Sequence, residues 1–145
     1  MKFRIEHVPE DVEHEVVIRC HAVDDAIRNL IGFLESPPRT LLGFESERLR
    51  IIDPERVFYI ESSDNKVFIH DDRCTYQSMK RLYELERDLD AYGFLRTSKS
   101  MVLNVRKIES VRPLFDGRLE ARLTNGETAG ISRTYVSALK TKIGL

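Results

Sequence analysis

The sequence predicts a mainly β fold, and three observations lead to that prediction. Short apolar runs rich in branched residues recur through the last hundred of the 145 residues, with polar turns between them. Only one clear helical stretch interrupts these runs. An Asn-Gly pair at 125–126 separates two segments of alternating hydrophobicity, which is typical of a tight hairpin. Together these features favour a β-rich sandwich over a helix-turn-helix module.

The first 40 residues predict a small β-hairpin followed by a helix. "KFRIEHV" (2–8) and "EVVIRC" (15–20) are expected to be strands around a polar turn. A helix follows, with Asp24 as its cap and apolar residues at helical spacing, and "SPPR" at 36–39 ends it. We therefore place a boundary near residues 36–41 and expect domains at 1–40 and 41–145. We also expect the first domain to dimerise, because it has more apolar surface than 40 residues can hide: Val16, Ile18, Ile27, Leu30 and Ile31.

From Leu41 onward the pattern is mostly β. Residues 53–72 predict a hairpin around "SSDN" (62–65), and 78–92 predict a helix that Gly93 ends. The apolar stripe of that helix is Met79, Leu82, Leu85, Leu89 and Tyr92. Strands are expected again at "SMVLNV" and "KIESVRPL" and on both sides of Asn125-Gly126, and the tail at 133–145 is expected to form a short helix. The predicted core is Phe58, Ile60, Val67, Ile69, Leu103 and Leu123.

Charge is divided unevenly along the chain. Residues 1–92 hold 13 Lys and Arg against 20 Asp and Glu, whereas residues 93–145 hold 10 against 4, so the net charges are −7 and +6. No acid occurs from Gly93 to Ile108. This asymmetry suggests a basic part that meets an anion, and the alternative is a solvated Lys/Arg face without a partner.

Several function classes find little support in the sequence. No apolar run approaches the ~20 residues of a membrane span, and the start lacks the apolar core of a signal peptide, so we expect a cytoplasmic protein. The two cysteines, Cys20 and Cys74, are expected to be reduced. The spacing of His and Cys does not predict a metal site. Nucleotide-loop and hydrolase motifs are absent, and the basic half has no paired carboxylates, so we expect no enzyme activity, no cofactor and no small-molecule substrate.

Three short stretches could contact an anion, and each has a plainer explanation. "RTSKS" (96–100) combines cations with hydroxyls that suit phosphate oxygens, but it could be a solvated loop. Arg133 in "GISRTY" could bind guanine or phosphate, or simply be hydrated. Asn65 and Lys66 lie at an expected hairpin tip, where asparagine suits the turn for backbone reasons alone.

The chain resembles the LytTR family over about residues 45–145. The resemblance depends on "VFYIESSDNKVFIHDD", "LYELERDL", "GFLRTSKSMVLNVRKIESV" and "LTNGETAGISRTYVSALK", which occur in this order. It implies a bacterial DNA-binding domain of transcription regulators: an elongated β-sandwich of short sheets with one short helix, which inserts loops into successive major grooves. Because residues 1–40 are too few for a receiver domain, the chain looks like a stand-alone member, response-regulator-like in its DNA-binding part.

The resemblance also implies roles for particular residues. Lys99 and Arg133 stand at base-contacting positions, and Asn65 or Lys66 stands at the third contacting loop. Where many members carry a histidine this chain has Ser98, which can bond phosphate but cannot titrate near neutral pH. We expect phosphate contacts from Arg96, Ser98, Ser100 and Lys107.

The expected partner is duplex DNA with direct repeats, bound by a homodimer. Some members are restrained by a membrane protein, which is a possible further partner here. The alternative function is a protein-interaction module or anti-regulator with weak DNA binding.

Overall fold

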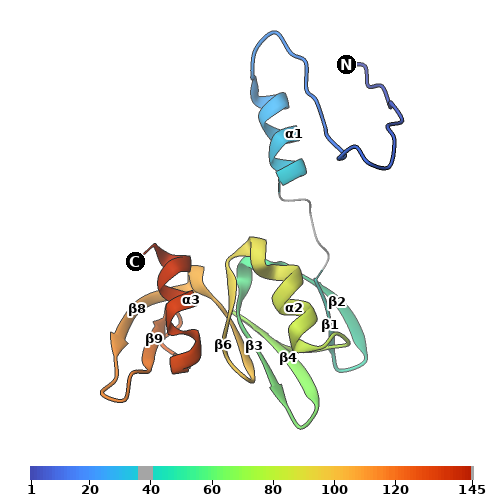
Figure 1. Cartoon of the computed structure of the whole chain (residues 1–145). Helices are drawn as coiled ribbons and strands as arrows, with labels where there is room; N and C mark the ends of the chain where they lie inside the picture. The colour runs from blue at the N-terminus through green and yellow to red at the C-terminus, as the bar shows by residue number, and fades with distance from the viewer. Residues whose placement is uncertain (36–40, 145) are drawn as a thin grey trace. The chain divides into compact units, whose positions relative to one another are not determined.

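The computed structural model describes residues 1–35 and 41–144, and for Phe33 the backbone only. The chain divides into two compact units, Met1–Pro37 and Pro38–Leu145 (Figure 1). The mainly β fold class is confirmed, since the described residues form ten strands and three short α-helices. The boundary expected near residues 36–41 falls mainly outside the described ranges.

Unit 1 contains one helix, α1 (Asp25–Glu35). The Asp24 carboxylate accepts a hydrogen bond from the Ile27 amide at 2.9 Å, so Asp24 caps the helix as expected. The hairpin predicted at 2–8 and 15–20 is wrong, because residues 1–24 form a turn at 10–12 but no strand. An isolated two-stranded hairpin needs an apolar surface to pack on, and none of the described side chains of residues 1–35 is buried.

Unit 2 is built on a seven-stranded antiparallel sheet in the order β2-β1-β5-β4-β3-β7-β6. Its strands are β1 (Leu41–Glu45), β2 (Arg48–Ile52), β3 (Val57–Ser63), β4 (Lys66–Asp71), β5 (Thr75–Ser78), β6 (Phe94–Ser98) and β7 (Met101–Asn104). Helix α2 (Leu82–Leu89) connects β5 to β6 and is followed by a 3-10 turn, Asp90–Tyr92. Gly93 ends this stretch at φ 88°, where a residue with a side chain would be strained.

A second sheet has three strands in the order β10-β9-β8. These are β8 (Ile108–Pro113), β9 (Leu119–Leu123) and β10 (Thr128–Ile131). The Asn-Gly turn joins β9 to β10 as predicted, with Gly126 at φ 88° and the Asn125 side chain accepting from the Glu127 amide. The tail forms α3 (Arg133–Ile143), which contacts β6.

Two apolar cores lie on the two sides of the β3–β7 pair. Ile60 and Val102 pack with α2 in the first core, whereas Phe58 and Leu103 pack with the small sheet and α3 in the second. All six predicted core residues are buried. Because adjacent residues of β3 and β7 point to opposite faces, these strands tie the two sheets into one unit.

The predicted stripe of the central helix is only partly correct. Leu82, Leu85 and Leu89 are buried, but Met79 is 84% exposed because the helix begins at Leu82 rather than at residue 78. The Glu84 carboxylate accepts from the Arg81 amide at 3.3 Å, one half of a capping box. The chain therefore bends at residues 79–80, and Arg81, in an extended conformation, leads into the helix.

Candidate nucleic-acid interface

Three of the predicted contact segments meet at one edge of unit 2. The Ser62 amide donates to the Ser100 carbonyl at 2.8 Å, which holds the β6–β7 turn beside the β3–β4 hairpin. The Ser132 amide donates to the Thr97 carbonyl at 2.9 Å, which holds the start of α3 beside β6. We call this the loop edge, formed by the β3–β4 turn, the β6–β7 turn and the first turn of α3. It is the lower edge of unit 2 in Figure 1.

The β3–β4 turn has two residues at its tip, Asp64 at φ 52° and Asn65 at φ 63°. Two successive positive-φ residues are the type I′ turn that matches the twist of a hairpin, so backbone needs alone account for Asn65. Asn65 and Lys66 are both exposed. Their side chains are thus presented to solvent whatever their role.

The β6–β7 turn is held from within. The Ser100 amide donates to the Ser98 hydroxyl at 3.2 Å, and a terminal guanidinium nitrogen of Arg96 donates to the Lys99 carbonyl at 2.7 Å. The Arg96 Nε donates to the Glu86 carboxylate on α2 at 2.9 Å. These bonds fix the turn while the Lys99 side chain stays exposed.

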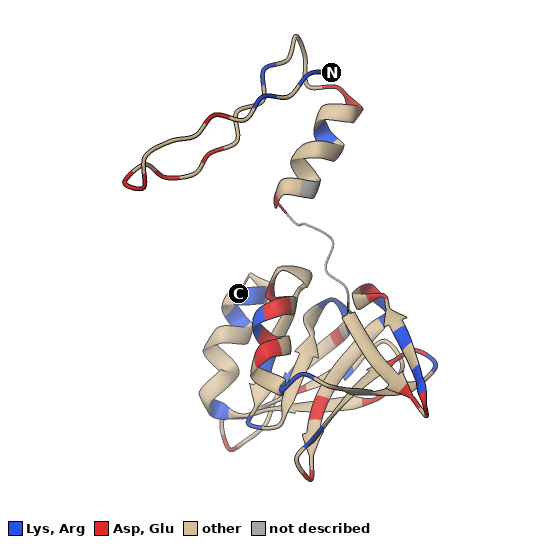
Figure 2. Ribbon diagram, turned by 90° about the vertical axis from the view of Figure 1, so that its right-hand side faces the viewer, with Lys and Arg blue, Asp and Glu red and all other residues tan. Residues whose placement is uncertain are grey.

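Arg133 is the first residue of α3, and its side chain is exposed. No acid occupies the first turn of this helix, and Figure 2 shows acidic positions on α2 but only basic ones on α3. A cation at the positive end of a helix dipole is unfavourable, by roughly 0.3–1 kcal/mol. Stability therefore does not account for Arg133, whereas an approaching anion would find both the guanidinium and the free helix amides.

The loop edge exposes three cationic side chains to solvent. Lys66, Lys99 and Arg133 form no ion pair with any residue that the structure describes. An exposed cation without a carboxylate beside it keeps its full charge for a partner. The edge can therefore present three positive charges to a polyanion.

Two predicted phosphate contacts have other surroundings. The Arg96 side chain is only 15% exposed and is paired with Glu86, so its charge is largely used within the protein. Lys107 precedes β8 at the opposite ends of the strands, where its carbonyl accepts from the Thr124 amide. Its ammonium lies 5.1 Å from the centre of the Phe58 ring. The structure thus brings together Asn65, Lys66, Ser98, Lys99, Ser100 and Arg133, but not Lys107.

Phe115 is a further exposed residue, one that the sequence patterns do not single out. It lies in the β8–β9 turn and is fully exposed, at 104% of the reference area. The turn touches Arg133, because a side-chain carbon built on Gly117 would come within 3.1 Å of the Arg133 Cδ. The signal in the sequence is a pair of apolar residues, Leu114 and Phe115, inside the turn segment "RPLFDGR".

The opposite end of the strands, which we call the far end, holds a polar hollow of about 270 Å³. Tyr59 and His70 stack there with ring centres 4.5 Å apart, and His70 contacts Glu61 at 2.8 Å. Burial, together with a hydrogen bond to Glu127, raises the pKa of Tyr59 to about 12. No group of three His, Cys, Asp or Glu side chains suited to a metal ion occurs among the described residues.

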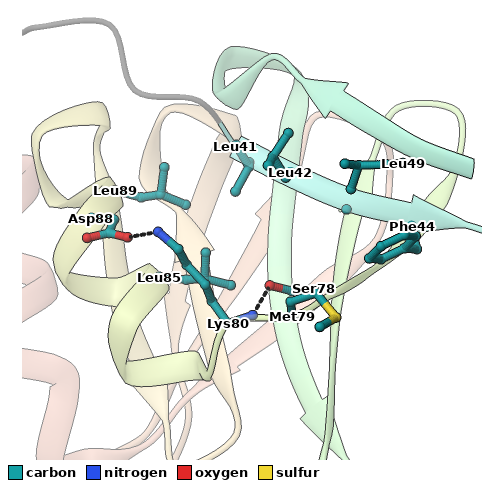
Figure 3. A pocket seen from close by; sticks show the side chains of 11 residues that line it. Leu41, Leu42, Phe44, Leu49, Ser78, Met79, Lys80, Leu85, Asp88 and Leu89 are labelled. Atoms are coloured by element: carbon teal, nitrogen blue, oxygen red, sulfur yellow. Dashed lines mark hydrogen bonds and ion pairs between the residues drawn. The ribbon is translucent and has the colours of Figure 1, made fainter.

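A larger apolar groove lies between α2 and the β1–β2 ribbon (Figure 3). Its volume is about 580 Å³, and Leu42, Phe44 and Leu49 face Leu85 and Leu89 across it. Lys80 and Asp88 form an ion pair of 2.7 Å at its side. None of the predicted contact residues lines this groove, so it is separate from the loop edge.

A mainly β domain with exposed cations on its turns and at a helix start is suited to meet an anion with loops rather than with a recognition helix. The model of the LytTr DNA-binding domain matches residues 47–144, and the chain therefore belongs to this family. The resemblance inferred from the sequence is confirmed. Among the described residues, no helix is long and apolar enough to cross a membrane.

Two known proteins are similar to this chain in sequence. The chain is 32% identical over 99 residues to the sensory transduction protein LytT of Enterococcus faecalis, covering 68% of this chain and 41% of that protein. It is 23% identical over 147 residues to a Staphylococcus aureus protein described as an uncharacterized HTH-type transcriptional regulator, covering 100% of this chain and 99% of that one. The chain thus spans about two-fifths of the LytT proteins but nearly the whole of the second relative.

A solved structure shows the same fold. The LytTr DNA-binding domain of a Bacillus cereus response regulator superposes with a TM-score of 0.69 at 23% identity, covering 73% of this chain and 97% of that domain. At this level of identity the likeness establishes the fold of unit 2.

Proposed function

We propose that this protein is a transcription regulator that binds duplex DNA sequence-specifically with its loop edge in the major groove. The observation that carries the proposal is the gathering of Lys66, Lys99 and Arg133 on one edge, where none of them makes an ion pair with a described residue. Family membership and the similarity to LytT proteins support DNA as the partner. No catalytic role is proposed, and a regulator of this kind would act in the cytoplasm.

Within this proposal the residues divide into three roles. Lys99, Arg133 and one of Asn65 or Lys66 read base edges, where each good contact contributes about 1–3 kcal/mol of discrimination. Ser98 and Ser100 bond phosphate oxygens from the β6–β7 turn. Arg96 holds that turn in place through Glu86 and the Lys99 carbonyl instead of contacting phosphate itself.

The test begins with selection of bound sequences from a random duplex pool, followed by affinity measurements at several salt concentrations. Lys99→Ala and Arg133→Ala are each expected to weaken binding to the selected duplex about tenfold or more. Each variant should also relax the base preference at one position of the duplex. Lys140→Ala is the matched control, since it removes one exposed cation from the same helix as Arg133 but from its last turn. If all three variants bind like the wild type, the loop edge is not the interface.

We also propose that two copies bind direct repeats spaced near one helical turn, joined through unit 1. Supporting this, unit 1 leaves Val16 70% exposed and buries none of the described apolar residues of α1. Sedimentation should give a dimer that Leu30→Glu dissociates, and the selected sequences should contain two half-sites. A monomer at every concentration would contradict the dimer without affecting the DNA-binding proposal.

A second candidate function is a protein-interaction module or anti-regulator with weak DNA binding, for which a membrane-protein regulator is the candidate partner. The apolar groove beside α2 and the uncovered α1 favour this candidate. Duplex affinity that is the same for all sequences and for the Arg133→Ala variant would select it over the regulator.

A further inference from the structure

The β8–β9 turn presents one apolar ring to solvent. Two backbone hydrogen bonds close the turn, from the Leu114 amide to the Arg118 carbonyl at 2.9 Å and from the Gly117 amide to the Leu114 carbonyl at 3.2 Å. Gly117 adopts φ 84°, which lets the chain reverse without a side chain in the way. Phe115 takes no part in these bonds and is the most exposed large apolar residue that the structure describes.

This turn continues the loop edge. Leu119 pairs with Pro113 on one side and with Ile131 on the other, so the β8–β9 turn and the residues after Ile131 lie at the same end of the small sheet. Arg133 follows Ile131 by two residues, and its stem packs on Gly117. Figure 1 shows the β8–β9 turn reaching the edge that the β3–β4 hairpin also reaches.

The structure gives Phe115 no stabilising role. Its ring packs on neither core, and the turn would close equally well with a polar residue at this position. The charges of the turn cancel, because Arg118 binds the Asp116 carboxylate at 2.6 Å. The feature that the turn can offer a partner is therefore an apolar surface beside a cation.

We propose that Phe115 is a further DNA contact, which packs against a thymine methyl group in the major groove next to the base read by Arg133. The inference depends on the proposed DNA-binding function. The major groove displays one apolar group, the C5 methyl of thymine, and phenylalanine is suited to contact it. Such a contact adds affinity and selects thymine without adding charge.

The test uses the full chain and its selected duplex. Phe115→Ala is expected to weaken duplex binding about tenfold, because the variant loses the apolar area of a partly buried ring. The slope of affinity against salt concentration should be unchanged, since no charge is removed. Met79→Ala is the matched control, since it removes another highly exposed apolar side chain outside the loop edge. Its affinity should equal that of the wild type, and both variants should keep the wild-type melting temperature.

Replacing each thymine of the duplex by uracil then locates the contact. At one position the lost methyl is expected to weaken wild-type binding about fourfold and to leave Phe115→Ala unaffected. Equal affinities of wild type and Phe115→Ala, or no uracil position at which the two proteins differ, would overturn the contact. If the Lys99 and Arg133 variants lose affinity while Phe115→Ala does not, the proposed function stands and this inference fails. A wild type without duplex affinity would overturn both.

Discussion

The loop edge and the far end are two ends of the same strands, yet they use charge differently. At the far end, Arg56 donates two hydrogen bonds to Asp72, at 3.1 and 3.0 Å, and Lys107 lies over the Phe58 ring. At the loop edge, Lys99 and Arg133 have no ionic partner among the described residues. Arg56 and Lys107 are thus engaged within the fold at one end, whereas Lys99 and Arg133 at the other end make no ion pair with the described residues.

This difference shows that counting Lys and Arg along a sequence does not locate an interface. Lys107 and Lys99 are eight positions apart in the same acid-free stretch, but they lie at opposite ends of unit 2. What separates them is the tertiary environment: a ring under one ammonium and open solvent around the other. A cation that is paired or stacked must first lose that contact before it can bind phosphate.

The largest effect on DNA affinity should come from reversing charges at the loop edge, and the same kind of change at the far end is the comparison. The double variant Lys99→Glu, Arg133→Glu is expected to bind the selected duplex more weakly by about a thousandfold or more, because two base contacts are lost and two charge repulsions are added. Lys107→Glu at the far end should change affinity by less than about threefold. Fluorescence anisotropy at fixed salt measures all of these. A comparable loss in Lys107→Glu would show that the two ends do not differ in this way.

The role of Arg96 gives the next largest effect. Arg96→Met, which keeps the apolar stem, should weaken binding about tenfold by loosening the β6–β7 turn, with the salt slope unchanged. Glu86→Ala should weaken it about threefold for the same reason, although it removes a negative charge near the DNA.

The sign of the Glu86 effect distinguishes the two explanations. If Arg96 contacts phosphate directly, removing Glu86 frees its guanidinium and tightens binding. If Arg96 positions the turn, the same change weakens binding. The control breaks the ion pair between Arg56 and Asp72 at the far end. Asp72→Ala should leave duplex affinity at the wild-type value.

Local patterns predicted most of unit 2. Alternation at Leu119, Ala121 and Leu123 and the Asn125-Gly126 turn gave the β9–β10 hairpin correctly, because register and turn are set by neighbours in sequence. The same reasoning was wrong for the first 20 residues. Branched residues there suit a strand, but a strand forms only where a packing surface exists, and that surface is not encoded locally.

The candidate site was predictable only in part. Lys99 and Arg133 follow from motifs on expected turns, whereas the environments of Arg96 and Lys107 depend on Glu86 and Phe58, which lie 10 and 49 positions away in the chain. Pairings of this range cannot be derived from spacing. Phe115 was missed for a different reason, since an isolated exposed apolar residue in a turn becomes informative only once its neighbours in space are known.

A smaller effect should come from Thr97 beneath the loop edge. Its side chain is fully buried, and its hydroxyl has no hydrogen-bond partner among the described residues. An unsatisfied buried hydroxyl is costly, so Thr97→Val is expected to raise the free energy of unfolding by about 1 kcal/mol. Urea denaturation measures the change. Destabilisation instead would show that the hydroxyl is bonded, for example to a buried water, and duplex affinity should be unchanged in either case.

The smallest effect at neutral pH is expected at the far end, from Tyr59→Phe. The Tyr59 pKa is raised to about 12 by burial and by the hydrogen bond to Glu127, above the ordinary value of about 10. Because folding favours the neutral hydroxyl, its contribution to stability is complete below pH ~10 and is lost as the pH rises through about 12. At pH 7 the variant should lose only the hydrogen bond, about 1 kcal/mol or less.

Urea unfolding at pH 8 and pH 11 should show the wild type losing more stability than Tyr59→Phe, with unchanged duplex affinity at pH 8. Parallel losses in the two proteins would show that Tyr59 does not sense this pH range, and reduced affinity at pH 8 would extend the interface from the loop edge to the far end.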